Sequence, residues 1–279
     1  MQIPRLHSTV TAFWQSEISI GKISPRFTAF LLIVFMTELE TIILAGGQSA
    51  RMHSNQPKAL ARVADQTIID RLISGLARQG LNRISIALGH IQAPFAEHFE
   101  MAVQHPDSIP SFNQYSHAGL SIDLRLLDTG TGCDTGGRLW RMSKLLKTTF
   151  VLCWCDALWD VKVEKLHHLH TRVKALVTIL AVHPPGRFGR LSIDESMVTR
   201  FEEKPLVEKE WINGGLFIVE PEILDYMKGD NCSLECEVFP ALAKEGKLAA
   251  FRHEGLWHCV DTPADHVALD RLVRDGAFE

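Results

Sequence analysis

The segment that most constrains the fold is LAGGQSARMHSNQPK, residues 44–58, together with the short run that leads into it. That run, Glu40–Leu44, is largely apolar and β-branched, as expected of a strand buried in a parallel sheet. It ends in Gly46 and Gly47, which allow a sharp turn and let a ligand approach main-chain N–H groups. Such a turn forms a concave set of donors for phosphate oxygens. The sequence therefore predicts an anion site at the end of the first core strand.

Two cations follow this turn. Arg51 can bind phosphate oxygens two at a time, and Lys58, which follows Pro57, supplies a compact charge. A glycine turn with two cations suits a triphosphate. The spacing is neither GxxxxGK[ST] nor GxGxxG, so a Walker loop and a dinucleotide fingerprint are both absent. An ordinary strand and turn with two surface cations is the alternative interpretation.

Alternation of strand and helix patterns along the chain predicts an α/β fold with a doubly wound, mostly parallel sheet. We expect strands at 84–89, 124–127, 149–155, 175–183, 211–219, 248–253 and 256–260, with 104–120 as a loop. We expect helices at 67–80 and 94–103, a helix that opens within 131–139 and runs to about 146, and a helix that opens within 233–237 and runs to 243. His90 follows the second strand at its carboxyl end, where α/β sheets bind ligands. Two strands joined at 194–196 predict a hairpin over the mouth of the sheet.

Polar groups follow two later strands. Asp156 follows a near-continuous apolar strand, and a carboxylate beside a triphosphate loop is a natural magnesium ligand. A helix N-cap is the alternative role for Asp156. The glycine-rich stretch 131–139 opens a helix, whose free N–H groups suit an anion or a base edge. A long loop with a helix cap is the alternative for that stretch.

Length and charge limit the function classes. The 279 residues suffice for one large α/β domain or two small ones. The net charge of -4 gives no basic footprint, so we expect no nucleic-acid partner. The apolar run 27–35 is too short to cross a bilayer, so we expect no membrane partner. We interpret 1–35 as a dispensable or disordered extension before a domain at 36–279, with a signal peptide as the alternative.

The six cysteines include no C-x-x-C pair. Cys153 and Cys155 alternate along one predicted strand and therefore share a face. We expect buried, reduced thiols and a cytoplasmic protein; a zinc site that adds a distant histidine is the alternative. We expect His167, His168 and His170 to form a solvated helix face.

Residues 44–58 resemble the signature of the sugar nucleotidyltransferases, which is close to LAGGxGTRLxPxTxxxPKP. Ser49 and Ala50 replace its Gly-Thr, the following segment is shorter, and Ala59 replaces the second proline. These departures lean towards the molybdopterin and methylerythritol nucleotidyltransferases. Five later segments, in the family's order within 39–275, are similar to the glucose-1-phosphate cytidylyltransferases: TGGRL, PPGRFGRLSID, FEEKP, WINGGLFIVEP and LAKEGKLAAFRHEGLWHCVDTPADH.

The resemblance implies a Rossmann-like nucleotidyltransferase fold with a small β-hairpin and a C-terminal sugar-binding portion. It implies transfer of a nucleoside monophosphate, CMP from CTP, to a sugar 1-phosphate such as glucose 1-phosphate, with release of pyrophosphate. The partners would be a nucleoside triphosphate and a sugar 1-phosphate, and a homo-oligomer is compatible with the family. The alternatives are another triphosphate (UTP, dTTP or GTP), another sugar or alditol phosphate, or a non-catalytic nucleotide-binding regulatory subunit of the same fold.

The resemblance also implies roles for single residues. Arg51 would hold the β- and γ-phosphates, Lys58 would meet the α-phosphate, and Asp156 with Asp261 would hold Mg²⁺; an N-cap is the alternative for Asp261. The residues implied to face the nucleotide are Leu44, Ala45, Gly46, Gly47, Gly136 and Gly137. Lys204 is implied to meet the sugar phosphate, and Glu203, Asn213 and the backbone of Gly189 are implied to bind sugar hydroxyls.

Overall fold

The computed structural model describes residues 38–47, 57–108, 110–186, 190–202 and 210–278. Contacts divide the chain into two units, Met1–Phe35 and Met36–Glu279, and the fold below belongs to the second. The predicted extension at 1–35 lies outside the described residues, so its role stays a prediction. None of the helices found in the described ranges combines the length and the apolar character that spanning a membrane requires.

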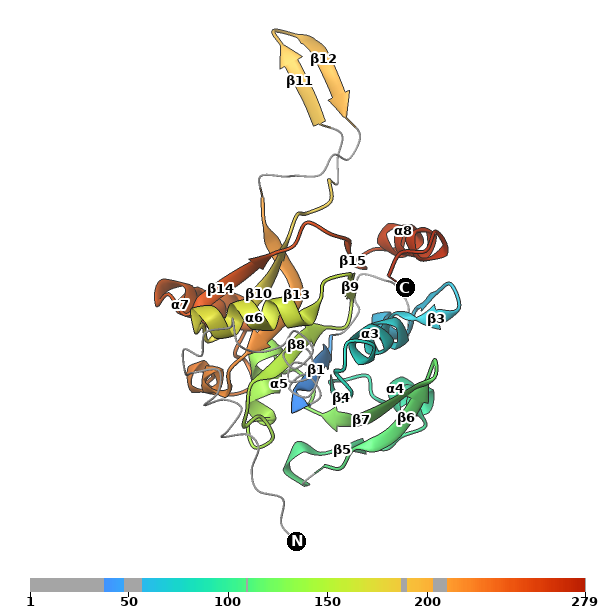
Figure 1. Ribbon diagram of the computed structural model, residues 1–279, viewed down its shortest axis with the longest axis vertical. Coiled ribbons are helices and arrows are strands. Elements are labelled where there is room, and N and C mark those ends of the chain that lie inside the picture. Colours follow the sequence, from blue (N-terminus) through green and yellow to red (C-terminus); the bar gives the residue numbers. More distant parts are fainter. Residues whose placement is uncertain (1–37, 48–56, 109, 187–189, 203–209, 279) are drawn as a thin grey trace, which may run out of the picture. The chain divides into compact units, whose positions relative to one another are not determined.

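A mixed sheet forms the centre of the described fold (Figure 1). Its strands, from one edge to the other, are β14 (Leu248–Arg252), β10 (Val177–Val182), β13 (Ile212–Val219), β8 (Phe150–Trp154), β1 (Glu40–Ala45), β4 (Arg83–Leu88), β7 (Leu120–Asp128) and β5 (Val103–Gln104), with β6 (Asn113–His117) paired to β7. Strand β13 runs antiparallel to β8 and β10, and β6 runs antiparallel to β7, whereas the other pairs are parallel. The predicted α/β fold with a mostly parallel sheet is confirmed.

Both faces of the sheet are covered at β1. Ile42 and Leu44 belong to a buried cluster that includes Leu139 of α5 (Thr135–Arg141) and Leu242 of α7 (Phe239–Lys244). Ile43 points to the opposite face, because neighbouring strand residues alternate, and it too is fully buried. The remaining helices are α3 (Ile68–Ala77), α4 (Ala93–Phe99), α6 (Val163–Val173) and α8 (Pro263–Arg274).

Short elements connect these layers. The described chain also has 3-10 or π turns η2 (Lys58–Leu60), η3 (Pro106–Ser108), η4 (Pro221–Tyr226) and η5 (Leu234–Val238), and two small strand pairs, β2 (Arg62–Val63) with β3 (Gln66–Thr67) and β9 (Ala157–Trp159) with β15 (Trp257–Cys259). The β9–β15 pair joins the segment after β8 to the C-terminal part of the chain.

The register places three chain segments at one edge. Leu44 of β1 lies opposite Ala87 of β4 and Trp154 of β8, all in parallel pairing. The segments that leave these strands therefore emerge side by side at their carboxyl ends, the edge where α/β sheets bind ligands.

Three predictions from sequence were wrong in whole or in part. The helix predicted at 94–103 ends at Phe99, and Val103 begins β5. Residues 104–120, predicted as a loop, include β6, a polar edge strand joined to β7 by Ala118 and Gly119. Both turn residues have positive φ, 49° and 75°, as in the tight turns that join hairpin strands. His170, predicted to be solvated, is buried between Thr178 and Glu220.

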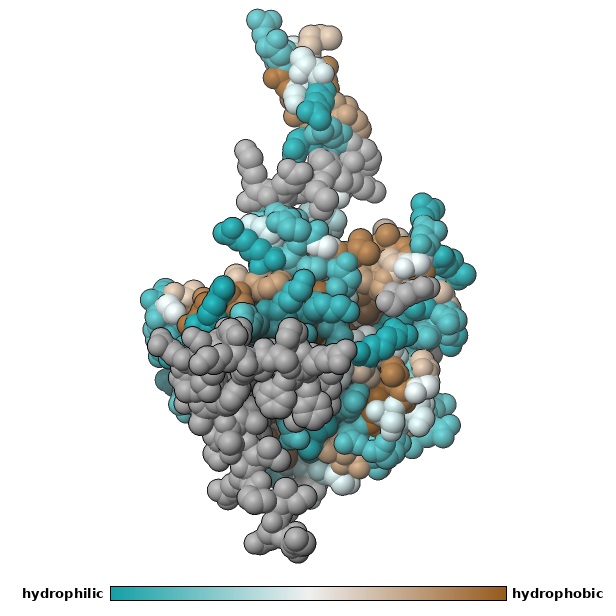
Figure 2. Space-filling view, in the orientation of Figure 1, coloured by the Kyte–Doolittle hydropathy of each residue, from teal (hydrophilic) through white to brown (hydrophobic). Residues whose placement is uncertain are grey.

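The predicted hairpin is confirmed as β11 (Arg190–Asp194) and β12 (Met197–Glu202). Its side chains are largely exposed, and Figure 2 shows apolar and polar residues mixed along it. The segments that join it to the sheet, 187–189 and 203–209, lie outside the described residues. Its placement over the mouth of the sheet stays a prediction.

Candidate active site

Three distant segments bring Lys58, Asp156 and Asp261 together. Lys58 begins η2, Asp156 follows β8, and Asp261 follows β15. The pairing of β9 with β15 holds the two aspartates close, because Cys259 lies opposite Ala157 and Val260 N–H donates to the carbonyl of Asp156 at 2.9 Å. The C-terminal part of the chain is thus needed to complete this group.

The Lys58 ammonium bridges the two carboxylates. Its Nζ lies 2.9 Å from Oδ2 of Asp156 and 2.8 Å from Oδ1 of Asp261, and the lysine side chain is 14% exposed. Burial alone would lower the pKa of Lys58, but attraction to Asp156 and hydrogen bonding to both carboxylates outweigh it and raise the pKa. Lys58 is therefore a charged ammonium at neutral pH.

Neither aspartate caps a helix. Helix α8 is capped by Thr262, which forms a capping box with Asp265. Helix α6 follows the segment after Asp156, and its N-cap position is Lys162. The N-cap alternatives were therefore wrong, and both carboxylates are available to Lys58.

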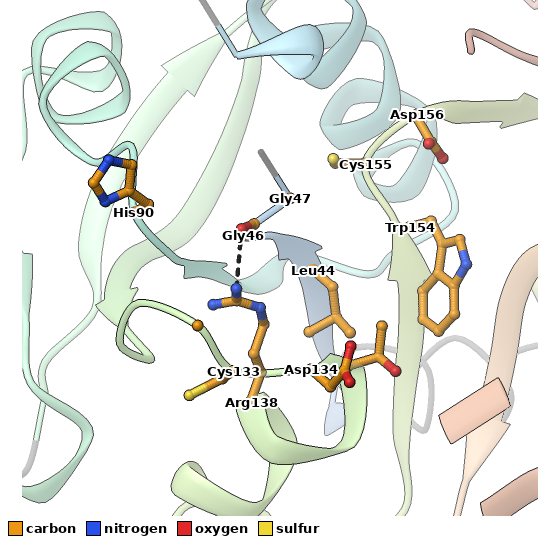
Figure 3. Close-up of a pocket in the computed structure, with 12 residues that line it drawn as sticks. Leu44, Gly46, Gly47, His90, Cys133, Asp134, Arg138, Trp154, Cys155 and Asp156 are labelled. Carbon is orange, nitrogen blue, oxygen red and sulfur yellow. Dashed lines mark hydrogen bonds between the residues drawn. The ribbon is translucent and has the colours of Figure 1, made fainter. Parts of the chain in front are cut away.

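A cavity of about 440 Å³ opens at the same edge of the sheet (Figure 3). Its lining comes from the ends of β1, β4 and β8 and from the segment that opens α5, and it includes Leu44, Gly46, Gly47, His90, Asp134 and Asp156. The glycine turn and Asp156 therefore line one space, which is large enough for part of a nucleotide.

Arg138 is a site residue to which sequence reasoning assigned no role. Its guanidinium lines the cavity, is buried, and donates to the carbonyl of Gly46 at 2.9 Å and to Thr129 Oγ1 at 3.0 Å. The only signal in the sequence is its place directly after the two glycines of TGGRL. Its burial depends on three strand ends that meet only in the folded chain.

Gly136 and Gly137 pack against the 230–232 segment. A Cβ at Gly137 would lie 1.9 Å from the carbonyl oxygen of Asp230, and one at Gly136 would lie 2.9 Å from that of Cys232. Gly137 N–H also donates to Cys232 O at 3.0 Å. This packing accounts for the two glycines without a ligand, so their contact with a nucleotide stays a prediction.

The structure gives little evidence on the roles of the remaining predicted site residues. Ala45 is buried at the end of β1. Asn213 is exposed near the start of β13, and its Oδ1 accepts from the N–H of Gly215 at 2.8 Å. Four predicted site residues lie outside the described residues: Arg51, Gly189, Glu203 and Lys204.

Within the described ranges, no group of three or more His, Cys, Asp or Glu side chains could hold a metal ion by itself. The predicted zinc alternative therefore has no support there. All six cysteines are free thiols. Cys133, Cys153 and Cys232 are buried, as predicted, whereas Cys155 and Cys259 are half-buried and Cys236 is exposed, so burial was predicted wrongly for these three. The pair Asp156 and Asp261 remains the arrangement that could share an ion with a ligand that supplies its own oxygens.

A profile of the nucleotidyl transferase family matches residues 40–271. The chain belongs to the nucleotidyl transferase family. The resemblance predicted from the motifs is thereby confirmed. The matched region contains Lys58, Asp156 and Asp261, so the whole charged group lies inside the family's own domain.

Individual members of this nucleotidyl transferase family extend the comparison. The chain is 29% identical over 250 residues to the glucose-1-phosphate cytidylyltransferase of Salmonella typhi, covering 85% of this chain and 97% of that protein. It is 25% identical over 238 residues to the mannose-1-phosphate guanylyltransferase catalytic subunit beta of Xenopus tropicalis, covering 81% of this chain and 62% of that protein.

Among solved structures, HddC from Yersinia pseudotuberculosis superposes with a TM-score of 0.63 at 19% identity, covering 84% of this chain and 99% of the other. A putative glucose-1-phosphate thymidylyltransferase from Bacillus anthracis gives a TM-score of 0.61 at 20% identity, covering 86% and 97% of the two chains. These superpositions establish the shared fold.

Proposed function

We propose that this nucleotidyltransferase transfers CMP from CTP to glucose 1-phosphate, giving CDP-glucose and pyrophosphate. The glucose-1-phosphate cytidylyltransferase of Salmonella typhi matches this chain over 97% of its own length. The five sequence segments of the same resemblance occur in order along the chain. A guanylyltransferase relative at 25% identity keeps GTP and mannose 1-phosphate as the second candidate pair.

The observation that carries the proposal is the Lys58 bridge beside the glycine turn. Lys58 joins carboxylates from two later segments, and Asp156 lines the same cavity as Gly46 and Gly47. A nucleotide whose phosphates enter this cavity meets the glycine turn and Asp156, and the Asp156 carboxylate contacts the Lys58 ammonium that also binds Asp261. Those are the groups that transfer between two phosphate anions requires.

The reaction is attack of a sugar-phosphate oxygen on the α-phosphorus of the triphosphate, and pyrophosphate leaves. The attacking oxygen is already anionic, so no general base is needed. The obstacle is repulsion between two polyanions, and catalysis therefore comes from positioning and charge neutralisation. In our proposal Lys58 exchanges its carboxylate contacts for the α-phosphate, where charge develops, and Arg51 stabilises the leaving pyrophosphate.

Asp156 and Asp261 fit a magnesium site that is completed by the substrate. Two carboxylate oxygens that both reach one ammonium lie close enough to reach one cation. Magnesium is usually bound by one or two carboxylates together with substrate phosphates. When bound, the ion would neutralise charge on the phosphates and orient them. The two aspartates would hold it, and departure of Lys58 towards the α-phosphate would remove its contacts with both carboxylates.

A pyrophosphate-release screen tests the proposal. Purified protein is incubated with CTP, UTP, dTTP or GTP, each with glucose 1-phosphate or mannose 1-phosphate, with and without Mg²⁺. The proposal expects fastest release with CTP and glucose 1-phosphate. Faster release with another pair would move the assignment to that pair. Nucleotide binding without turnover in any pair would favour a regulatory subunit.

A further inference from the structure

The start of β13 is set apart from the rest of that strand. Residues 216–219 pair with β8, whereas Ile212 and Asn213 pair with the end of β10 on the far side of a register shift. Gly215 lies in the irregular stretch between them and has a φ of 75°. Such a bulge interrupts the hydrogen-bonded ladder and re-aims side chains. The first residues of β13 therefore depend on contacts from outside the strand.

These residues lie at the edge of the sheet that carries the cavity. Because β13 runs antiparallel to β8 and β10, its start lies at the carboxyl ends of those two strands. A Cβ at Gly215 would lie 3.4 Å from Cβ of Trp154, which lines the cavity, and the N–H of Gly215 donates to Oδ1 of Asn213 at 2.8 Å. Asn213 is exposed, and its amide nitrogen has no acceptor among the described residues. Its two N–H groups can therefore donate to a ligand hydroxyl.

His183 joins the two chain segments that flank the β11–β12 hairpin. It follows the last residue of β10, and its Nδ1 lies 2.9 Å from the carbonyl oxygen of Glu210. A carbonyl oxygen can only accept, so Nδ1 carries the hydrogen and donates, whatever the charge of the ring. The ring also packs on the indole of Trp211, with centroids 3.9 Å apart, and the histidine side chain is 13% exposed. His183 thus extends the contact between β10 and β13 by one residue.

Strand β14 adds two weaker contacts. Glu254 lies 3.2 Å from Nε2 of His183, but the glutamate side chain is 73% exposed, and an ion pair so open to water contributes little. The guanidinium of Arg252 lies 5.6 Å from the ring centre of Trp211. The Nδ1 bond and the packing of the His183 ring are therefore the contacts that hold Glu210 and Trp211.

We propose that His183 is a positioning residue for the sugar phosphate: it holds the start of β13 so that the Asn213 amide is presented to a sugar hydroxyl. The inference rests on the proposed function, in which a sugar 1-phosphate is the second substrate. His183 acts through Glu210 and Trp211 on Asn213 and does not itself bind the substrate.

The test uses two variants that separate the ring of His183 from its hydrogen bond. His183→Phe keeps a ring that can pack on Trp211 but has no N–H, whereas His183→Asn loses the ring and keeps an amide N–H at the place of Nδ1. Pyrophosphate release gives kcat/KM for the sugar 1-phosphate that wild type uses best, calorimetry gives Kd for its triphosphate, and thermal melting reports folding.

The two variants should differ in one parameter. We expect His183→Phe to lower kcat/KM for the sugar phosphate by about 5- to 10-fold, in line with loss of one hydrogen bond, and to leave the triphosphate Kd within about twofold. His183→Asn should keep kcat/KM within about threefold of wild type, because it restores the donor. Unchanged kcat/KM in His183→Phe would overturn the inference, and an equal loss in His183→Asn would contradict the role of the Nδ1 bond.

His98→Phe is the matched control for folding. His98 also lies near a carboxylate, 3.1 Å from Asp70, and packs on a ring, 4.7 Å from that of Phe99, but it belongs to α4. His98→Phe should lower the melting temperature and leave kcat/KM for the sugar phosphate within about twofold. A loss of kcat/KM in His98→Phe equal to that in His183→Phe would show that general destabilisation is the cause, and would overturn the inference.

Coupling to Asn213 gives a second readout. Asn213→Ala should itself lower kcat/KM for the sugar phosphate, and adding His183→Phe should lower it by no more than about twofold further. Full additivity would contradict action through Asn213. Wild-type protein that releases no pyrophosphate with any sugar 1-phosphate would overturn the proposed function and this inference together, whereas an active wild type with unaffected His183 variants overturns the inference alone.

Discussion

The ammonium of Lys58 lies 2.8 Å from Oδ1 of Asp261, a residue 203 positions further along the chain. The contact ties the segment after the glycine turn to the last strand of the fold. The Lys58 ammonium also contacts Asp156, which lines the cavity, so it lies between two carboxylates. Substrate phosphates and the carboxylates therefore compete for one charge, and the first two predictions follow from that competition.

Lys58→Ala and Asp156→Ala should each remove most turnover while the fold stays intact. Loss of one group that stabilises developing charge typically lowers the rate by on the order of 10²–10³. Pyrophosphate release measures the rate, and circular dichroism checks the fold. Lys165→Ala removes an exposed lysine of α6 and should leave turnover unchanged. Near-normal release from either site variant would refute the assignment.

Removal of divalent ions should stop turnover in the wild type, and addition of Mg²⁺ should restore it. Asp261→Asn keeps the shape of the side chain but loses its charge. The variant enzyme should therefore need at least about tenfold more Mg²⁺ to reach its half-maximal rate. A magnesium titration of pyrophosphate release gives this value. An unchanged magnesium requirement in Asp261→Asn would remove this residue from the proposed metal site.

Gly137→Ala should destabilise the fold, because its Cβ would lie 1.9 Å from the carbonyl oxygen of Asp230, a backbone atom that cannot move easily. Overpacking of this kind costs about 1–3 kcal/mol in the free energy of unfolding. Gly75→Ala is the matched control in helix α3, where nothing lies within 4 Å of the added Cβ. It should be neutral or stabilising by up to about 1 kcal/mol, since alanine favours helices. Equal effects in urea unfolding would contradict this packing account.

Local patterns predicted the features of the fold that are local in origin. The apolar run into Gly46 identified β1, and the turn around Glu195 identified the hairpin, because both signals lie within a few residues. Asp156 was predicted to lie at the site because it follows an apolar strand closely in the sequence. Strand β6 was missed because an edge strand exposed on one side is polar, like a loop.

Long-range partners could not be predicted in the same way. Nothing near Arg138 in sequence shows that its guanidinium meets the end of β1, because that contact depends on sheet register. His170 lies in a helix with His167 and His168, and only the partners Thr178 and Glu220 make it a buried residue. Charged and polar residues at buried positions are found from the folded structure.

The burial of His170 leads to a prediction for stability. It lies 2.9 Å from both Thr178 Oγ1 and a carboxylate oxygen of Glu220, so His170→Leu should remove a partner from each. We expect a loss of about 1–3 kcal/mol in the free energy of unfolding. His168→Leu alters an exposed position of the same helix and should stay within about 0.5 kcal/mol of wild type. Similar losses in both variants, measured by urea unfolding, would count against the buried network.

Asp70 should make stability depend on acid pH. Its buried carboxylate accepts from Thr67 Oγ1 at 2.6 Å and from Tyr115 OH at 3.3 Å, and it lies 3.1 Å from Nε2 of His98. Burial alone would raise the pKa of this carboxyl, but hydrogen bonds from His98 and Thr67, with the charges of His98 and His117, outweigh it and lower the pKa below 3.8. The ionised form is therefore the one that the fold stabilises.

The sign of the pH effect follows from the lowered pKa. The contribution of Asp70 is fully present above pH 3.8 and is lost as the pH falls through the lower pKa of the folded state. Asp70→Asn should therefore lower the free energy of unfolding by about 1–3 kcal/mol at pH 7. The difference in free energy of unfolding between variant and wild type should become smaller below pH 3.8. Urea unfolding at several pH values measures the gap, with the exposed Asp225→Asn as control. A gap that stays constant from neutral to acid pH would show that the Asp70 charge contributes nothing to folding.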